Sequence, residues 1–273
     1  MKPYILITND DGIRSGGIKA VYEAVKDFAD VLVAAPARER SGASNSVTIW
    51  KSIKVKKQKF LDASGYAVSG TPADCVKLGV LSLAKRKPDL VISGINHGPN
   101  FGRFILYSGT VGGATEAALR GIPSIAASLD DFEKKADFSF AGEVVRSMAK
   151  AFFSKKIRIN SDTIININIP RHKRDEVKGF KVLPKGNCEY VESYEKFSDN
   201  GSETYRWMVN ERVEGSALSM PDSVAVRSGY VVITPLHIDT TNHTGMSRLK
   251  KEMLKKGVMP EGFVLPASRR KKA

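Results

Sequence analysis

Near its N-terminus the chain reads Tyr4-Ile5-Leu6-Ile7-Thr8, followed at once by Asn9-Asp10-Asp11-Gly12. The apolar run is typical of a buried strand, and the doublet after it places two carboxylates where the strand ends. In open α/β sheets this end of the strands is where ligands bind. Adjacent carboxylates repel each other, and a divalent cation between them would relieve that repulsion. Asn-Asp-Asp-Gly also suits a plain turn, so a metal site requires partners elsewhere in the chain.

The rest of the chain alternates between strand and helix patterns. Residues 16–28 repeat apolar side chains every three or four positions, which indicates an amphipathic helix, and residues 31–35 form a short β-branched run ended by Pro36. Further strands are predicted at 89–93, 123–128, 163–169 and 230–234, and further helices at 71–83, 110–120, 140–153 and 246–255. This alternation predicts an α/β fold with a doubly wound, mainly parallel sheet.

The 273 residues are interpreted as a single α/β domain, 1–273, with two distinct segments inside it. Residues 171–229 are polar, rich in turn formers and without helical period, with short β-like pieces at 180–183 and 204–209. We expect them to form an extended β-rich arm that serves as an oligomerisation element. Residues 257–273 are expected to form a loose basic tail.

Composition narrows the class of protein. Hydrophobic residues make up 42% of the chain, enough for a sizeable core, and no apolar stretch reaches the length of a membrane span. No signal-peptide pattern is seen at the N-terminus, and Cys75 and Cys188 are too few for a disulfide framework. These features predict a soluble cytoplasmic protein with no membrane partner.

The formal net charge of +14 indicates an affinity for anions. Basic residues concentrate at 51–59, 85–87, 171–174, 248–256 and 269–272, and a solvated surface explains each cluster taken alone. No zinc-ligand spacing, aromatic RNA-binding stretch or basic zipper accompanies them. Nucleic acid is therefore not expected as a dedicated partner.

Three more loops follow a predicted strand or open a predicted helix. Residues 36–46 offer hydroxyls beside two arginines, residues 93–102 combine glycine and proline breaks with two asparagines, and residues 107–116 place small hydroxyl residues at a helix start. Exposed amides at a helix start favour phosphate, although plain capping explains the third loop equally well and a hydrophilic connection the first. The breaks in the second loop indicate a backbone pressed closely against another group. His97 is ambiguous, since a lone histidine in a loop is more often a hydrogen-bonded structural residue than a metal ligand or a base.

Taken together, these loops bring only oxygen donors toward one site: Asp10, Asp11, Ser41 and Asn96. Oxygen ligands suit magnesium, manganese or calcium rather than zinc or copper. A hard cation next to an anion-binding helix start is what hydrolysis of a phosphate ester requires.

Together, these motifs resemble those of a known family, the survival-protein SurE family of metal-dependent 5′-nucleotidases. The matching pieces keep the family's order between residues 4 and 239: ILITNDDGI (5–13), SGAS (41–44), VSGTPADCV (68–76), SGIN and GPN (93–100), YSGTVGGATEAALRGIPSIAASL (107–129) and GYVVITPL (229–236).

The resemblance implies a Rossmann-like core, a C-terminal arm exchanged between subunits, and a homodimer or homotetramer. It implies hydrolysis of nucleoside 5′-monophosphates, with 3′-nucleotidase and exopolyphosphatase side activity toward short polyphosphate. One divalent cation per subunit, Mg²⁺ or Mn²⁺, is implied at Asp10, Asp11, Ser41 and Asn96. The positions implied around the substrate phosphate are Asn9, Ser44, Asn100, Ser108, Gly109 and Thr110.

Two departures from the family pattern fall in loops. Glu39-Arg40 stands where the family often carries Asn-Gln, and Arg103 and Phe104 stand where it usually has acidic or polar residues. Both concern substrate preference, and Arg103 suggests a preference for more highly charged anions.

The preferred mechanism is attack of a metal-activated water on phosphorus, with Asp10 and Asp11 as the catalytic carboxylates. Attack by one of the carboxylates, through an aspartyl-phosphate, stays open. The alternative function is a non-enzymatic basic protein that binds nucleic acid or polyphosphate. A phospho-acceptor signalling domain is a third interpretation, which the SGIN and SGTVGG loops disfavour.

Overall fold

The computed structural model of the chain describes residues 1–133, 135–186, 189–199, 202–212 and 220–256. It comprises two compact units, residues 1–238 and 239–273. The described part of the second unit contains helix α6 (His243–Lys256), on which Met246 and Leu249 are exposed. The predicted basic tail 257–273 and Cys188 lie outside the described residues.

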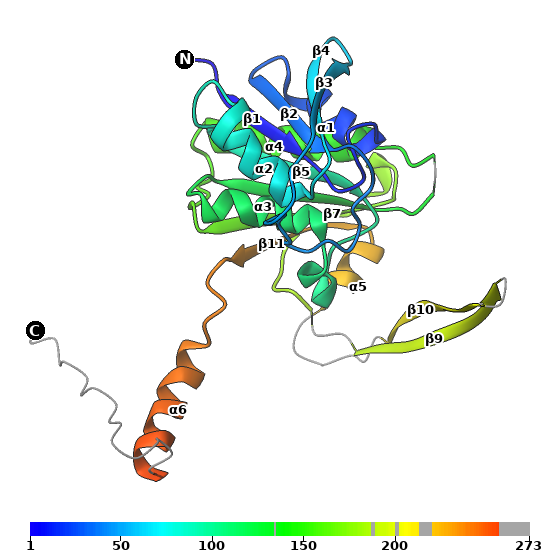
Figure 1. Cartoon of the computed structure of the whole chain (residues 1–273), viewed down its shortest axis with the longest axis vertical. Coiled ribbons are helices and arrows are strands. Elements are labelled where there is room, and N and C mark those ends of the chain that lie inside the picture. The colour runs from blue at the N-terminus through cyan, green and yellow to red at the C-terminus, as the bar shows by residue number, and fades with distance from the viewer. Residues whose placement is uncertain (134, 187–188, 200–201, 213–219, 257–273) are drawn as a thin grey trace, which may run out of the picture. The chain divides into compact units, whose positions relative to one another are not determined.

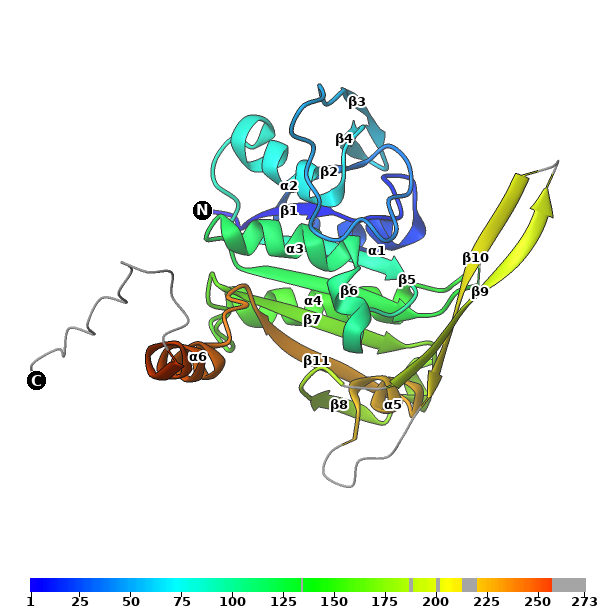
Figure 2. The same cartoon turned by 60° about the horizontal axis from the view of Figure 1, so that its bottom comes forward.

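The first unit is built on a nine-stranded sheet with the order β3-β4-β2-β1-β5-β6-β7-β11-β8 (Figures 1 and 2). Within this order, the six strands from β4 to β7 run parallel to one another. The outer strand β3 is antiparallel to β4, and β11 is antiparallel to β7. Their bounds are β1 (Tyr4–Thr8), β2 (Asp30–Pro36), β3 (Val55–Phe60), β4 (Ala63–Val68), β5 (Leu90–His97), β6 (Ser124–Asp130), β7 (Thr163–Pro170), β8 (Gly179–Val182) and β11 (Tyr230–His237).

Helices cover both faces of this sheet. Alternating side chains of β1 separate the two layers: Ile5 and Ile7 pack with α1 (Gly16–Val25) and α4 (Ser139–Phe153), and Tyr4 and Leu6 pack with α2 (Pro72–Leu78) and α3 (Gly109–Leu119). The fold is therefore α/β and mainly parallel, as the alternation of apolar segments predicts.

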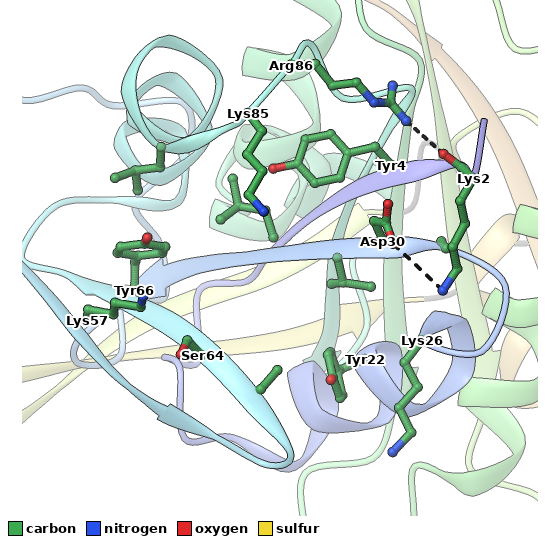
Figure 3. Close-up of a pocket in the computed structure, with 15 residues that line it drawn as sticks. Lys2, Tyr4, Tyr22, Lys26, Asp30, Lys57, Ser64, Tyr66, Lys85 and Arg86 are labelled. Atoms are coloured by element: carbon green, nitrogen blue, oxygen red, sulfur yellow. Dashed lines mark hydrogen bonds and ion pairs between the residues drawn. The ribbon is translucent and has the colours of Figure 1, made fainter.

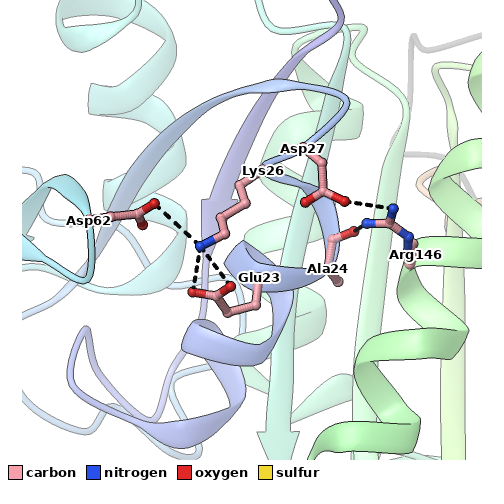
Figure 4. Close-up of polar contacts among 6 residues, drawn as sticks. All are labelled: Glu23, Ala24, Lys26, Asp27, Asp62 and Arg146. Carbon is pink, nitrogen blue, oxygen red and sulfur yellow. Dashed lines mark hydrogen bonds and ion pairs between the residues drawn. The ribbon is translucent and has the colours of Figure 1, made fainter.

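Polar contacts also join α1 to α4 on the first face. Arg146 of α4 donates to the carbonyl oxygen of Ala24 at 2.7 Å and pairs with Asp27, also at 2.7 Å (Figure 4). The guanidinium lies over the ring of Phe28 as well, 5.5 Å from its centroid. One side chain thus holds the C-terminal end of α1 against the neighbouring helix.

The chain changes direction between β1 and β5. It builds outward from β1 to β2 and β4, then returns to place β5 on the other side of β1. At such a switch point the loops after two neighbouring strands diverge and leave a crevice for a ligand. The loop with Asp10 and Asp11 follows β1, and Asn96 lies at the end of β5, so both border this crevice.

Residues 171–229 contain more structure than their sequence pattern indicates. Strands β9 (Glu189–Asp199) and β10 (Ser202–Arg212) form a separate two-stranded sheet, and a short helix, α5 (Asp222–Arg227), follows. The lack of helical period in this stretch predicted no helix there. That prediction is wrong for α5, which spans less than two turns. The role of the arm in assembly stays a prediction.

Most predicted elements are confirmed with small shifts of their bounds. The predicted helix start at Thr71 is a capping box, in which the Thr71 side chain accepts from the Asp74 amide and the Asp74 carboxylate accepts from the Thr71 amide. The hairpin of β3 and β4 was not predicted. Its first strand, rich in lysine and largely exposed, buries only Phe60 and so lacks a strong apolar alternation.

Candidate active site at the carboxyl ends of β1 and β5

The two adjacent carboxylates occupy unlike surroundings. Asp10 is 3% exposed, and burial raises the pKa of its carboxyl group, opposed by a hydrogen bond from Thr110. Burial, reinforced by the neighbouring charge of Asp10, raises the pKa of Asp11 to about 7. Two such carboxylates favour a cation between them, because a positive charge would offset both the desolvation and the repulsion.

The start of α3 lies directly against Asp10. The hydroxyl of Thr110 donates to Oδ1 of Asp10, and a Cβ on Gly109 would lie only 2.9 Å from Oδ2 of Asp10. Ser108 caps the helix, since its Oγ accepts from the amide of Val111 at 3.1 Å. The positive end of the helix dipole therefore faces the same space as the carboxylate, which suits an anion bound next to a cation.

The end of β5 supplies an amide and a backbone contact. The side-chain nitrogen of Asn96 donates to the carbonyl oxygen of Gly98 at 2.6 Å, which leaves its Oδ1 as the acceptor. The amide of His97 donates to Oδ2 of Asp11 at 3.0 Å, and the His97 ring nitrogen Nε2 lies 2.6 Å from the carbonyl oxygen of Glu133. His97 is thus tied into the loop framework through both backbone and ring.

The loop after β2 closes over these residues. The amide of Arg40 donates to the backbone oxygen of Asp10 at 2.7 Å, and the hydroxyl of Ser41 donates to Glu39 at 2.8 Å. Ser44 donates from its amide to the carbonyl oxygen of Tyr107 at 3.0 Å and from its hydroxyl to that of Leu106 at 2.7 Å. Ser41 is thereby fixed between the doublet loop and the start of α3.

A buried asparagine network anchors the second half of the β5 loop. The amide of Asn100 donates to Oδ1 of Asn168 at 2.7 Å, and its carbonyl oxygen accepts from the side chains of Asn166 and Asn168 at 2.9 and 3.0 Å. The Asn100 side chain donates to Ser128 at 2.8 Å. Asn166 and Asn168 are 0% exposed, so β7 holds this loop by buried hydrogen bonds, while Oδ1 of Asn166 is left without a partner among the described residues.

These loops enclose a pocket of about 460 Å³, called here the carboxyl-end pocket. Asp10, Ser41, Asn96, Asn100 and Ser108 line it on the polar side. Aromatic side chains line the other side, with the ring centroid of Trp207 at 6.3 Å from those of both Phe104 and Tyr107. The pocket thus joins a group of oxygen atoms to a flat apolar wall.

The structure brings most of the predicted site residues to this place. Asp11, Gly109 and Thr110 lie next to the lining residues through the contacts above. Asn9 and Ser44 are turned into the loop framework: the Asn9 side chain donates to the Gly12 carbonyl oxygen and to Ser15 Oγ. Oδ1 of Asn9 is buried and has no hydrogen-bond partner within the described parts of the chain.

Four further residues that were not predicted from the sequence line the pocket: Phe132, Trp207, Val209 and Arg227. Trp207 and Val209 come from β10, more than a hundred residues from the doublet. No local pattern signals that this strand lies over the loop of Phe104. An ion pair of 2.7 Å between Arg103 and Glu192 joins the hairpin to that loop.

The residues fit a hard cation better than a soft one. Among the described residues, no group of three or more His, Cys, Asp and Glu side chains is placed to hold a metal. The donors at hand are two carboxylates, the Ser41 hydroxyl and the Asn96 amide oxygen, which are oxygen ligands of the kind that Mg²⁺ and Mn²⁺ take together with water. The unpaired Oδ1 of Asn9 and the raised pKa values of Asp10 and Asp11 also fit a site that receives a positive charge.

The fold and the pocket define an α/β protein of Rossmann-like layout with an oxygen-lined site at the switch point of its sheet. Comparison with known proteins identifies the family. The family model described as "Survival protein SurE" matches residues 5–192, and this chain belongs to the SurE family.

Similar proteins cover nearly the whole chain. A protein named 5′-nucleotidase SurE from Pelotomaculum thermopropionicum is 42% identical over 250 residues, which are 90% of this chain and 94% of that protein. One of the same name from Kosmotoga olearia is 41% identical over 91% of this chain and 98% of its own. The crystal structure of the SurE protein from Aquifex aeolicus matches with a TM-score of 0.77 and 41% identity, over 92% of this chain and 99% of that one. None of the helices in the described residues has the length and apolar character needed to cross a membrane.

Proposed function

We propose that this chain is a 5′-nucleotidase that hydrolyses nucleoside 5′-monophosphates to nucleoside and phosphate. The observation that carries the proposal is the buried doublet Asp10-Asp11 in contact with the start of α3 and open to an aromatic wall. The relatives named 5′-nucleotidase SurE support the same activity.

Asp10, Asp11, Ser41 and Asn96 would hold one divalent cation, Mg²⁺ or Mn²⁺. When bound, the cation supplies Lewis-acid chemistry: it neutralises phosphoryl charge and favours ionisation of a water molecule. Phosphate release measured with each metal in turn distinguishes the two.

The chain's own residues position the phosphate. Amides at the start of α3, with the hydroxyl groups of Ser108 and Thr110 around them, stabilise negative charge on the phosphoryl oxygens. Asn100 lines the pocket on a loop held rigidly by Asn168. Asn9, Ser44 and Gly109 hold the loops that carry these groups, so their proposed role in phosphate binding is indirect.

The reaction exchanges one bond to phosphorus for another. The oxygen of water bonds to phosphorus while the bond from phosphorus to the ribose O5′ breaks, and O5′ leaves as the hydroxyl group of the nucleoside. Direct attack by water is favoured over an aspartyl-phosphate, because Asp10 is already engaged by Thr110 and Asp11 by the His97 amide. A substrate with a chiral phosphorus separates the two routes, because one displacement by water inverts the configuration, and overall retention would contradict direct attack.

The aromatic wall of Phe104, Tyr107 and Trp207 suits the base and ribose of the substrate, since aromatic faces stack on nucleobases. The pocket also has room for 3′-nucleotides and for short polyphosphate, which we propose as side substrates. A homodimer or homotetramer in the cytoplasm is proposed as well, with the exposed Tyr194 and Phe197 of β9 as contacts between subunits.

The test is phosphate release from 5′- and 3′-nucleotides and short polyphosphate, with Mn²⁺, Mg²⁺ or EDTA. We expect metal-dependent release that EDTA abolishes and that Asp10→Ala lowers by about a thousandfold or more. Asp30→Ala, which removes an exposed carboxylate at the opposite end of β2, is the matched control and should retain activity. Release that survives both EDTA and Asp10→Ala would contradict the proposal, and no release with any metal would favour a binding protein for polyphosphate.

A further inference from the structure

A second cavity lies at the opposite ends of the same strands. It has a volume of about 670 Å³ and is bordered by the first residues of β1 and β2, the end of α1, the hairpin of β3 and β4, and the turn at 85–86 (Figure 3). It is called here the amino-end cleft. Its size is that of a site for a small organic molecule and exceeds what a single phosphate ion would fill.

Cations from separate segments converge on the amino-end cleft: Lys2, Lys26, Lys57, Lys85 and Arg86. Asp30 is the one carboxylate among its lining residues, and it lies 3.8 Å from Lys2. These residues come from four segments that are far apart in the sequence, so the fold, and not one basic run, assembles the charge.

The cations differ in how far their charge is already balanced. Lys26 contacts Glu23 at 2.8 Å and Asp62 at 3.3 Å (Figure 4), and Arg86 contacts Asp89 at 3.0 Å. For Lys57 and Lys85, no ion pair with a carboxylate is present within the parts of the chain that the structure describes. These two ammonium groups are therefore available to an added anion.

The wall between these two lysines is aromatic and apolar. Tyr66 pairs directly with Lys57 across the antiparallel strands β3 and β4, so both side chains lie on one face of the hairpin. Figure 3 shows Tyr4 beside Lys85 and Tyr66 beside Lys57, and Leu32 and Leu83 are among the apolar residues that also line the cleft. Flat rings and aliphatic groups next to free ammonium groups suit a ligand that joins an aromatic ring to phosphates.

We propose that the amino-end cleft binds a nucleoside di- or triphosphate, with its phosphates at Lys57 and Lys85 and its base against Tyr66. This site is separate from the carboxyl-end pocket, because the five residues of β1 place about 17 Å of extended strand between them. It lacks the carboxylate pair of that pocket and uses ammonium groups for the phosphates, so it binds without metal.

The test is isothermal titration of ADP, pyrophosphate and adenosine into the full chain in EDTA, repeated in an Asp10→Ala, Asp11→Ala background. We expect ADP to bind in both backgrounds, and Lys57→Ala with Lys85→Ala to weaken it about tenfold or more. Tyr66→Ala should weaken ADP about fivefold and leave pyrophosphate unchanged. Loss of nucleotidase activity in the aspartate background with ADP binding retained separates this inference from the proposed function.

The matched control is Lys19→Ala with Lys156→Ala, which removes the same charge from exposed positions outside the amino-end cleft. Equal weakening of ADP binding by both lysine pairs would overturn the inference, since it would reflect overall charge alone. Absence of ADP binding would overturn it too. Pyrophosphate binding as tight as that of ADP would overturn the assignment of a nucleoside to the aromatic wall.

Discussion

The carboxyl-end pocket and the amino-end cleft are built on the same two strands, β1 and β2, and have opposite local charge. At one end, Asp10 and Asp11 are buried, and hydrogen bonds from three loops hold the site in one geometry. At the other end, lysine side chains stand on exposed segments around an apolar floor. The two proposals thus give two ways to receive a phosphate: at a buried acidic site together with a cation, and at an exposed cationic site without one.

The largest difference between the two ends should appear on removal of one negative charge. In metal-free protein, Asp11→Asn is expected to raise the free energy of unfolding by about 2 to 4 kcal/mol at pH 8. The pKa of Asp11 is raised from 3.8 to about 7, so folding of the wild type disfavours the ionised form. The gain is absent below pH 4, grows as pH rises toward 7 and is complete above it.

Urea unfolding in EDTA across pH 4 to 8 measures this gain. Asp30→Asn is the control at the amino end, where the exposed pair with Lys2 contributes less than about 1 kcal/mol. Equal effects of the two substitutions would remove the electrostatic contrast between the ends. Added Mn²⁺ should shrink the advantage of Asp11→Asn if a cation binds the doublet.

The next prediction concerns the rigidity of the carboxyl end. Asn168→Ala deletes two buried hydrogen bonds to Asn100 and leaves the Asn100 amide without its acceptor. We expect a loss of about 2 to 3 kcal/mol in the free energy of unfolding, measured by urea denaturation. Ser64→Ala in the amino-end cleft, an exposed position, should change it by less than about 0.5 kcal/mol. A loss below that figure for Asn168→Ala would show that the asparagine network does not stabilise the loop.

A smaller effect is expected at the aromatic wall. Trp207→Ala removes a ring that contacts Phe104 and Tyr107 in the carboxyl-end pocket. Loss of a stacking face worth about 1 kcal/mol should raise KM for AMP about fivefold and leave kcat nearly unchanged. Steady-state kinetics provide the measurement, with Trp50→Ala, which truncates a 94% exposed ring outside the pocket, as the control. A fall in kcat with constant KM would place Trp207 nearer the reacting phosphate than its position in β10 indicates.

The smallest effect is expected for Arg103→Ala. The ion pair with Glu192 already balances this guanidinium and lies on a partly exposed surface, so the free energy of unfolding should change by less than about 1 kcal/mol. If Arg103 causes a preference for highly charged substrates, Arg103→Ala should lower the ratio of polyphosphate turnover to AMP turnover. Arg158→Ala, exposed and outside the pocket, is the control. An unchanged ratio would remove Arg103 from substrate selection.

Local chemistry made the carboxyl end predictable. An apolar run followed by Asp10-Asp11 gives both the strand and the position of the carboxylates, and the capping pattern at Thr71 gives a helix start within one residue. Assembly of Ser41 and Asn96 next to the doublet follows from a parallel sheet, because the carboxyl ends of parallel strands meet at one edge. The positions of residues that follow from local sequence signals could therefore be predicted.

The remaining features depend on contacts between distant segments. Trp207 lies in the carboxyl-end pocket because β10 packs over the loop of Phe104, and no spacing in the sequence encodes that contact. The amino-end cleft joins Lys2, Lys57 and Lys85 from unrelated segments, one of them in an unpredicted hairpin. Basic runs in the sequence indicated charge but not the place where it converges.

Strand β3 has a consequence beyond either site. It is an outermost strand of the nine-stranded sheet, and three of its six residues are exposed lysines, Lys56, Lys57 and Lys59. A second chain that added a strand along this border in register with its own β3 would bring like charges face to face, which disfavours edge-to-edge aggregation. The lysines that leave β3 hard to recognise as a strand thus also help keep the folded protein dispersed at high concentration.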